Sequence, residues 1–168
     1  DGDRISAVGS VGAAKAELDA AGWHLAPGLI DTHSHDDGAF FRYPGMEFKL
    51  SQGVTTVVAG NCGFSAIPAD PTMDAARASG GILAGLTGQF TDLNGYFATV
   101  LQQRPAINNM MLVGHNTVRT LAMGYAHRAP DGAEMRAMKD AVTTAMEQGA
   151  CGFSTGLIYR PGRWSETE

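Results

Sequence analysis

The run Gly53–Gly63 places the strongest constraint on the fold of this chain. Its first half, Val54 to Val58, is a continuous β-branched stretch, and small residues close the run. This pattern is typical of a strand that is buried on both faces of a parallel sheet. Parallel strands need a crossover connection, which is usually a helix. The run therefore predicts an α/β fold.

Strand-like segments alternate with helical segments along the chain. The sequence predicts strands near residues 29–34, 54–60, 109–114 and 150–155, and helices over 44–53, 93–103 and 131–149. The last helix has the clearest signals, because a capping pair, Asp131 and Glu134, opens it and Gly149 ends it. Alternation of this kind predicts parallel strands in sequential order, with helix 131–149 packed outside them.

The remaining segments are less regular. Residues 63–92 are expected to form a long loop with helical pieces, one of them near 73–79. Residues 1–26 are interpreted as β-hairpin material outside the main domain. The chain begins without Met inside a strand-like alternation, and Ser165 with Glu168 is a helix start signal at its end. We therefore expect the chain to be a fragment.

Composition argues against several classes of partner. The 168 residues carry a formal charge of -5 and no cluster of Lys and Arg, which argues against nucleic acid or an anionic membrane surface as partner. No apolar run is long enough to span a bilayer and no signal peptide opens the chain, so a cytoplasmic location is expected. The two cysteines, Cys62 and Cys151, indicate no disulfide framework, and Cys151 is expected to be buried.

His33 and His35 stand at or just past the end of the first predicted strand. Side chains one residue apart on an extended segment point to the same side, so the two imidazoles can share a metal ion. Cys62 follows the second strand, and the carboxyl ends of parallel strands are where α/β folds build their sites. Imidazole and thiolate suit zinc, although a lone His-x-His is also found as a hydrogen-bonding pair. The sequence predicts that the three side chains converge.

Other polar residues near the strand ends have open roles. His115, at the tip of the third strand, is either a substrate-binding residue or a hydrogen bonder between loop and strand. Tyr159 and Arg160 follow the fourth strand and are further candidates for substrate binding, although an arginine in such a loop is commonly just solvent-exposed. Asp36 and Asp37 are either hydrogen-bond partners of the histidines or turn formers.

Four segments resemble the N-acyl-D-amino-acid deacylases of the amidohydrolase superfamily. They are Gly-Leu-Ile-Asp-Thr-His-Ser-His-Asp-Asp at 28–37, Gly-Val-Thr-Thr-Val-Val-Ala-Gly-Asn-Cys-Gly-Phe-Ser at 53–65, Val-Gly-His-Asn-Thr-Val-Arg at 113–119 and Gly-Phe-Ser-Thr-Gly-Leu-Ile-Tyr at 152–159. The resemblance implies that residues 28–168 are the first half, strands one to four, of a metal-dependent (β/α)8 TIM barrel. It also implies that residues 1–27 are part of a small β-sandwich.

The same resemblance implies the roles of the candidate residues. Cys62 would be the thiolate ligand of one tight Zn²⁺ site, and His33 and His35 would belong to an adjoining, weaker site. Two further histidine ligands and the general-base aspartate are expected beyond residue 168, in the missing C-terminal half of the chain, so no catalytic residue is expected within this fragment. The intact enzyme would hydrolyse small-molecule N-acyl-D-amino acids to a D-amino acid and a carboxylate, whereas the fragment alone would be inactive.

Three alternatives stay open. The first is another amidohydrolase that acts on a cyclic or linear amide, as hydantoinases and dihydroorotases do. The second is an inert barrel fragment, because four parallel strands without their other half leave two open edges. The third is a serine hydrolase, since Gly152–Gly156 matches Gly-x-Ser-x-Gly. It is disfavoured because Leu157–Gly162 contains Pro161 and does not read as the required helix, and no His follows Ser154.

Overall fold

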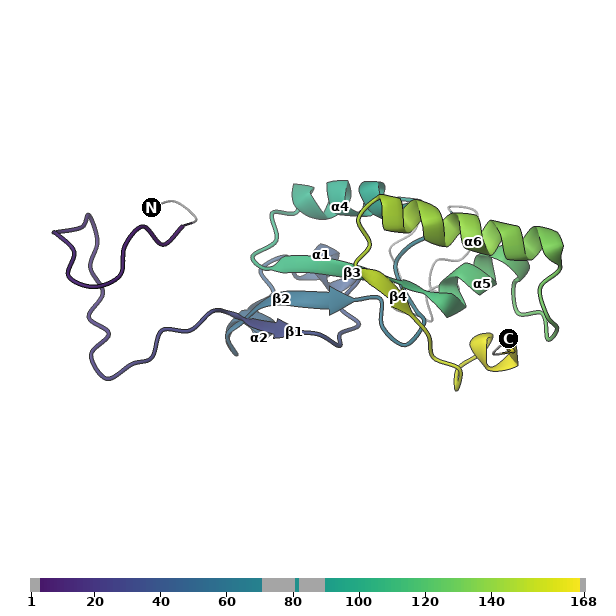
Figure 1. Cartoon of the computed structure of the whole chain (residues 1–168), viewed down its shortest axis with the longest axis horizontal. Helices are drawn as coiled ribbons and strands as arrows, with labels where there is room; N and C mark the ends of the chain where they lie inside the picture. Colours follow the sequence, from purple (N-terminus) through teal and green to yellow (C-terminus); the bar gives the residue numbers. More distant parts are fainter. Residues whose placement is uncertain (1–3, 71–80, 82–89, 167–168) are drawn as a thin grey trace.

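The computed structural model describes residues 4–70, 81 and 90–166. Its strands form one parallel sheet in the order β1-β2-β3-β4 (Figure 1). They are β1 (Leu29–Asp31), β2 (Val54–Ala59), β3 (Asn108–Gly114) and β4 (Gly152–Ser154). The predicted parallel arrangement in sequential order is confirmed, and β1 and β4 are shorter than expected.

Helices α4 and α6 lie along the same side of this sheet (Figure 1). In chain order the helices are α1 (Ala39–Arg42), α2 (Glu47–Leu50), α4 (Leu93–Gln102), α5 (His115–Met123), α6 (Gly132–Glu147) and the 3-10 helix η1 (Gly162–Trp164). The helices predicted over 93–103 and 131–149 are confirmed, whereas the one over 44–53 is reduced to α2. The helical piece expected near 73–79 lies outside the described residues.

Helix α5 does not follow from the sequence pattern. It begins at His115 directly after β3, and its N-cap, Gly114, offers no side-chain hydrogen bond. Most of its buried residues are polar, namely Asn116, Thr117, Arg119 and Thr120. A helix that buries polar groups shows no apolar stripe, so its signal is absent from the sequence. Hydrogen bonds to neighbouring loops, rather than apolar packing, hold this helix in place. One example is the bond from Thr117 Oγ1 to the carbonyl oxygen of Ser65 at 3.2 Å.

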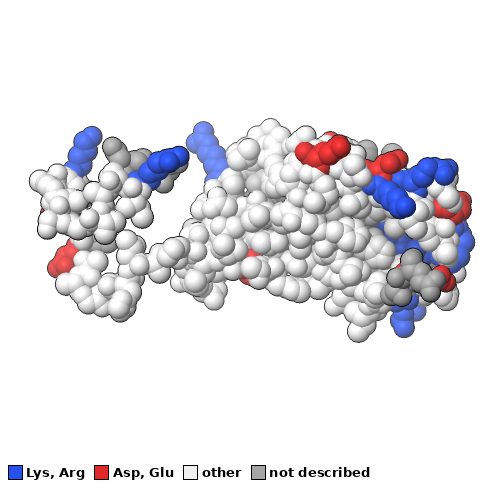
Figure 2. All heavy atoms as spheres, in the orientation of Figure 1, with Lys and Arg blue, Asp and Glu red and all other residues white. Residues whose placement is uncertain are grey.

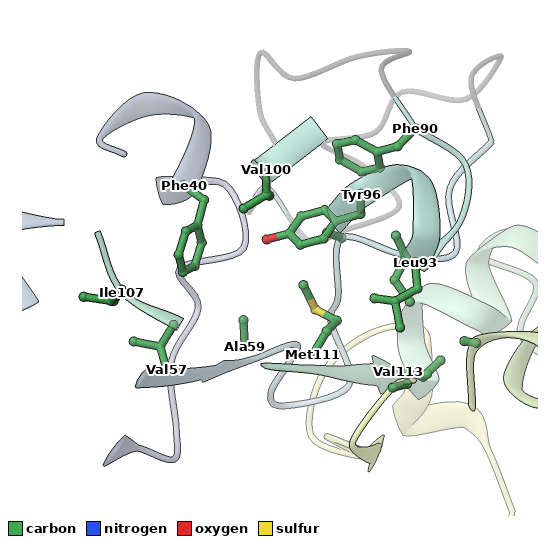
Figure 3. Packing of buried hydrophobic residues seen from close by; sticks show 14 of the residues in the cluster. Phe40, Val57, Ala59, Phe90, Leu93, Tyr96, Val100, Ile107, Met111 and Val113 are labelled. Carbon is green, nitrogen blue, oxygen red and sulfur yellow. The ribbon is translucent and has the colours of Figure 1, made fainter. Parts of the chain in front are cut away.

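The hydrophobic core lies between the sheet and the helices that cover one of its faces (Figure 3). Alternate strand residues point into it, and none of these is more than 1% exposed: Val57 and Ala59 of β2, Met111 and Val113 of β3. Phe40 of α1 and Tyr96 of α4 pack over them (Figure 3). Alternation with period 2 delivers every second side chain of a strand to this face, as expected for a sheet covered by helices.

The other face of the sheet is open. Ile30 of β1 and Met110 of β3 are 59% and 43% exposed. At the β4 edge, Phe153 is half exposed, and Cys151 is exposed rather than buried as the sequence predicted, because no strand beyond β4 covers it among the described residues. A closed barrel buries the inward-facing side chains of its strands. The four strands therefore have the shape of a half-barrel.

Residues 4–28 form an extended arm that leads away from the sheet (Figure 1). They contain no strand, so the β-hairpin expected in this segment is wrong for the described residues. Trp23 and Leu25 are 82% and 98% exposed. Isolated two-stranded hairpins are marginal in water, and every residue of this arm that the structure describes is exposed. The assignment of residues 1–27 to a β-sandwich stays a prediction.

Besides several on and beside the extended arm, the charged side chains on the face shown in Figure 2 gather toward the end of the molecule that carries α6. Both signs are interspersed there, and the ion pair between Arg128 and Glu134, at 2.6 Å, belongs to the loop and helix α6 at this end. A mixed distribution creates no strong field of one sign on this face. None of the helices described here is long and apolar enough to cross a membrane.

Helix α6 begins at a complete capping box, which allows a stability prediction. Asp131 accepts the N–H groups of Ala133 and Glu134 at 2.8 Å, and Glu134 accepts the N–H of Asp131. The substitution Asp131→Ala should lower the free energy of unfolding by about 1 kcal/mol, because two N–H groups lose their acceptor. Denaturant titration measures this loss. Asp140→Ala, exposed on the same helix, is the control and should change it by less than about 0.5 kcal/mol. Equal losses would contradict the capping role.

Candidate metal centre

His33, His35 and Cys62 lie together at the carboxyl ends of β1 and β2, and we call them the His-His-Cys cluster. One potential ligand atom from each lies within 4.8 Å of the other two. His33 Nε2 is 3.3 Å from Cys62 Sγ, and the two imidazole centroids are 5.9 Å apart. The predicted convergence is confirmed. Ligand atoms on one tetrahedral zinc ion are separated by about 3.3 to 3.8 Å, and paired metal ions lie about 3.5 to 4 Å apart. The cluster can therefore hold one zinc ion after a contraction of about 1 Å, or share two adjoining ions.

The cluster is accessible and its donors suit a metal ion. Both histidines are exposed and Cys62 is half-buried. Partial burial lowers the pKa of His35, and the neighbouring His33 lowers it further. Neutral imidazole is the form that binds a metal, so this shift favours coordination. A thiol beside two imidazoles is a donor set of the kind that zinc sites use.

Cys62 is held in a rare backbone conformation. Its φ is +57°, and Gly60 and Gly63 on either side have φ of +80° and +82°. Residues other than glycine seldom adopt this left-handed region, and such outliers gather at functional sites. At Gly60 an added Cβ would lie 2.1 Å from the carbonyl oxygen of Leu112 in β3. The turn at residues 60–63 is therefore packed directly on the neighbouring strand.

The loop that carries the two histidines is held by an ion-pair network. Lys49 Nζ of α2 lies 2.6 Å from Asp31 Oδ2, at the end of β1, and 2.9 Å from Asp36 Oδ2, just after His35. The hydrogen bond from Lys49 lowers the pKa of Asp31. Asp36 also accepts a hydrogen bond from Ser34 Oγ at 2.8 Å. One lysine thus ties both ends of the histidine loop to α2.

Asp37 joins the histidine loop to the loop after β2. Its carboxylate is fully buried and accepts the N–H groups of Gly60 at 3.3 Å and Ala66 at 2.9 Å. Burial raises the pKa of Asp37 to about 6, while these N–H groups act in the opposite direction. The sequence left two roles open for Asp36 and Asp37, as hydrogen-bond partners of the histidines or as turn formers. Their contacts support the second role, in which they shape the loop backbone.

His115 lies outside the His-His-Cys cluster. Its ring nitrogens are 3.3 Å from Thr155 Oγ1 and 3.4 Å from Ser165 Oγ. The ring also lines a groove of about 500 Å³ between α6 and Phe153. Burial lowers the pKa of His115, and Arg119 lowers it further. These contacts match the predicted hydrogen bonder between loop and strand, and a contact with substrate stays a prediction.

Tyr159 and Arg160 differ in their surroundings. The ring of Tyr159 is 5.7 Å from that of Phe64, two residues after Cys62. Tyr159 therefore lies beside the turn that presents the thiol. The guanidinium of Arg160 lies 5.7 Å from the ring centre of Trp164, within its own loop. Their roles in substrate binding stay predictions.

Two residues that contact the Cys62 turn were not predicted to do so. Ser154 Oγ accepts the N–H of Gly63 at 3.0 Å and donates to the carbonyl oxygen of Gly60. Asn116 Nδ2 donates to the carbonyl oxygen of Cys62 at 3.3 Å. The Gly-x-Ser-x-Gly pattern around Ser154 matches a nucleophile elbow, but that motif needs a helix directly after the strand, and residues 155–161 form coil and turns instead. No local signal in the sequence could reveal contacts between such distant segments.

Comparisons with known proteins found several relatives of this chain. A sequence profile described as the amidohydrolase family matches residues 16–159. An N-acyl-D-glutamate deacylase from Alcaligenes xylosoxydans xylosoxydans is 47% identical over 98% of this chain and 34% of its own length. A D-aminoacylase from the same organism is 39% identical over 99% of this chain and 35% of its own length. The chain thus spans about a third of the length of these relatives.

A solved structure shows the same fold. It is the N-acyl-D-glutamate deacylase from Bordetella bronchiseptica, in complex with zinc and a phosphonate inhibitor that mimics the tetrahedral intermediate. The TM-score is 0.72 at 48% sequence identity, and the match covers 83% of this chain and 29% of that chain. The half-barrel described above therefore corresponds to one part of this relative, which is a larger protein that contains zinc.

Proposed function

This chain belongs to the amidohydrolase family, and on that basis we propose that the full-length protein carrying it hydrolyses the amide bond of N-acyl-D-amino acids. The observation that carries the proposal is the convergence of two imidazoles and a thiol within 4.8 Å at adjacent strand ends. The 47% identity to an N-acyl-D-glutamate deacylase supports the substrate class. The products would be a free D-amino acid and a carboxylate.

We assign the zinc ligands within this chain to the His-His-Cys cluster. Cys62 would hold the tight zinc site, and His33 and His35 would serve an adjoining, weaker site. Bound zinc supplies a Lewis acid and lowers the pKa of a water molecule to about 7. The solved relative that contains zinc and a mimic of a tetrahedral intermediate supports this chemistry.

The other residues of this chain contribute by holding the donors in place. Lys49 and Asp37 fix the histidine loop against α2 and against the loop after β2. Tyr159, half exposed beside the Cys62 turn, is proposed to contact the acyl or the carboxylate end of the substrate. Arg160 and His115 are weaker candidates, since both are engaged with their own surroundings. The base that moves protons from water to the leaving amine is proposed to be an aspartate outside residues 1–168.

Amine release tests this proposal. The full-length protein with zinc should release D-glutamate or D-methionine from the N-acetyl derivatives, and the N-acetyl-L compounds are the control. The 168-residue polypeptide alone should be inactive, because loss of a general base alone costs about 10²- to 10⁴-fold in rate.

Two outcomes would contradict the proposal. Zinc-dependent turnover by the 168-residue polypeptide, abolished by Cys62→Ala, would show that the site is complete within it. Hydrolysis of a cyclic amide such as a hydantoin, without hydrolysis of any N-acyl-D-amino acid, would favour the other amidohydrolase chemistry.

A further inference from the structure

We propose that Ser154 is a positioning residue for the Cys62 thiolate, and that its hydroxyl sets the metal affinity of the His-His-Cys cluster. The inference rests on the proposed role of Cys62 as a zinc ligand. Ser154 lies on β4, at the far side of β3 from the strand that leads to Cys62. It would act through the backbone of the turn rather than by contact with metal or substrate.

The hydroxyl of Ser154 closes the turn that presents the thiol. It accepts the N–H of Gly63 at 3.0 Å and donates to the carbonyl oxygen of Gly60. These two glycines bracket Asn61 and Cys62, so a single oxygen atom joins both ends of the turn. The hydroxyl thereby already uses its hydrogen atom and one lone pair in hydrogen bonds. It is therefore better suited to holding the turn in place than to acting as a nucleophile.

The turn needs these hydrogen bonds because its backbone conformation is unfavourable by itself. Cys62 and both glycines have positive φ, and a non-glycine residue persists there only when its surroundings hold it. Asn61 Nδ2 donates to the carbonyl oxygens of Val58 at 2.8 Å and of Ser34 at 3.2 Å, so the turn also contacts the loop between the two histidines. A shift of the turn would therefore change the distance between thiol and imidazoles.

Other contacts should keep the turn folded when the hydroxyl is removed. Asp37 accepts the N–H of Gly60, and the carbonyl oxygen of Gly63 accepts the N–H of Thr117 at 3.1 Å. Asn116 holds the carbonyl oxygen of Cys62. Loss of the Ser154 hydroxyl should thus loosen the position of the thiol without unfolding the loop.

The experiment compares four variants of the full-length protein: Ser154→Ala, Ser154→Thr, Cys62→Ser and Thr99→Ala. Thr99 is the matched control, because its half-buried hydroxyl donates to the carbonyl oxygen of Gly95 at 2.8 Å within α4. Zinc affinity is measured by competition with a chelator. The thiolate-to-metal absorption of the cobalt-substituted protein reports the thiolate ligand directly.

Ser154→Ala should weaken zinc binding about 10- to 100-fold, the range typical for residues that orient a metal ligand, and should reduce the thiolate-to-cobalt absorption. Ser154→Thr keeps a hydroxyl and should restore both, while Thr99→Ala should change neither. Parental affinity in Ser154→Ala would overturn the inference, and so would weaker binding with an unchanged cobalt spectrum. If Cys62→Ser itself keeps the parental affinity and absorption, the proposed zinc site fails instead.

Discussion

Replacement of Cys62 by alanine in the full-length protein should abolish zinc-dependent deacylation. The variant should lose zinc affinity by at least about 100-fold, since even residues that only orient a ligand contribute 10- to 100-fold. The physical reason is the loss of the negatively charged donor from a cluster whose other members, His33 and His35, are neutral when they bind a metal. Metal analysis after dialysis and amine release from N-acetyl-D-glutamate measure the two effects.

Cys151→Ala is the matched control for this experiment. Cys151 is exposed, and its thiol lies 3.3 Å from the carbonyl oxygen of Met111, away from the His-His-Cys cluster. This variant should keep zinc content and activity. A Cys62→Ala protein that retains zinc as well as Cys151→Ala does would contradict the assignment of the thiolate ligand.

The largest loss of stability is expected for Gly60→Ala. The new Cβ would lie 2.1 Å from the backbone carbonyl oxygen of Leu112, and the residue would have to keep φ near +80°. Leu112 is paired with Gly152 of β4, so its backbone cannot move aside without disturbing the pairing of β3 with β4. We expect the free energy of unfolding to fall by about 4 kcal/mol or more, measured by denaturant titration.

Gly53→Ala separates the steric effect from the conformational one. Gly53 has nearly the same φ, +79°, but an added Cβ there would meet no atom within 4 Å. Gly53→Ala should therefore lower the free energy of unfolding by only about 1 to 2 kcal/mol, which is the cost of a left-handed conformation in a residue that has a Cβ. Equal losses at the two positions would show that the contact with Leu112 is not the cause.

Elements with strong local signals could be predicted from the sequence. Helix α6 has a capping box at Asp131 and a terminal glycine, and β2 is a β-branched run, so their existence follows from short stretches of residues. The cluster was predictable for a related reason. His33, His35 and Cys62 follow strand ends, and parallel strands bring those ends to one edge of the sheet.

Other features had no local signal. Helix α5 buries Asn116, Thr117 and Arg119 instead of an apolar stripe, so its periodicity is hidden until neighbouring loops supply hydrogen bonds. His115 stands at a strand end like the three residues of the cluster, yet its ring turns toward Thr155 and Ser165. Position at a strand end is therefore not sufficient to place a side chain in the site.

The sequence by itself determined the order of parallel strands and the donor types at their ends, because strand alternation, helix caps and residue chemistry are local properties. Only the tertiary structure decided how those donors are held. Ser154 bonds the carbonyl oxygen of Gly60 from 94 residues away, and Asp37 reaches the N–H of Ala66 across two loops. Such bonds depend on the final packing of segments, since a serine or an aspartate has the same local pattern whether or not a partner lies opposite it.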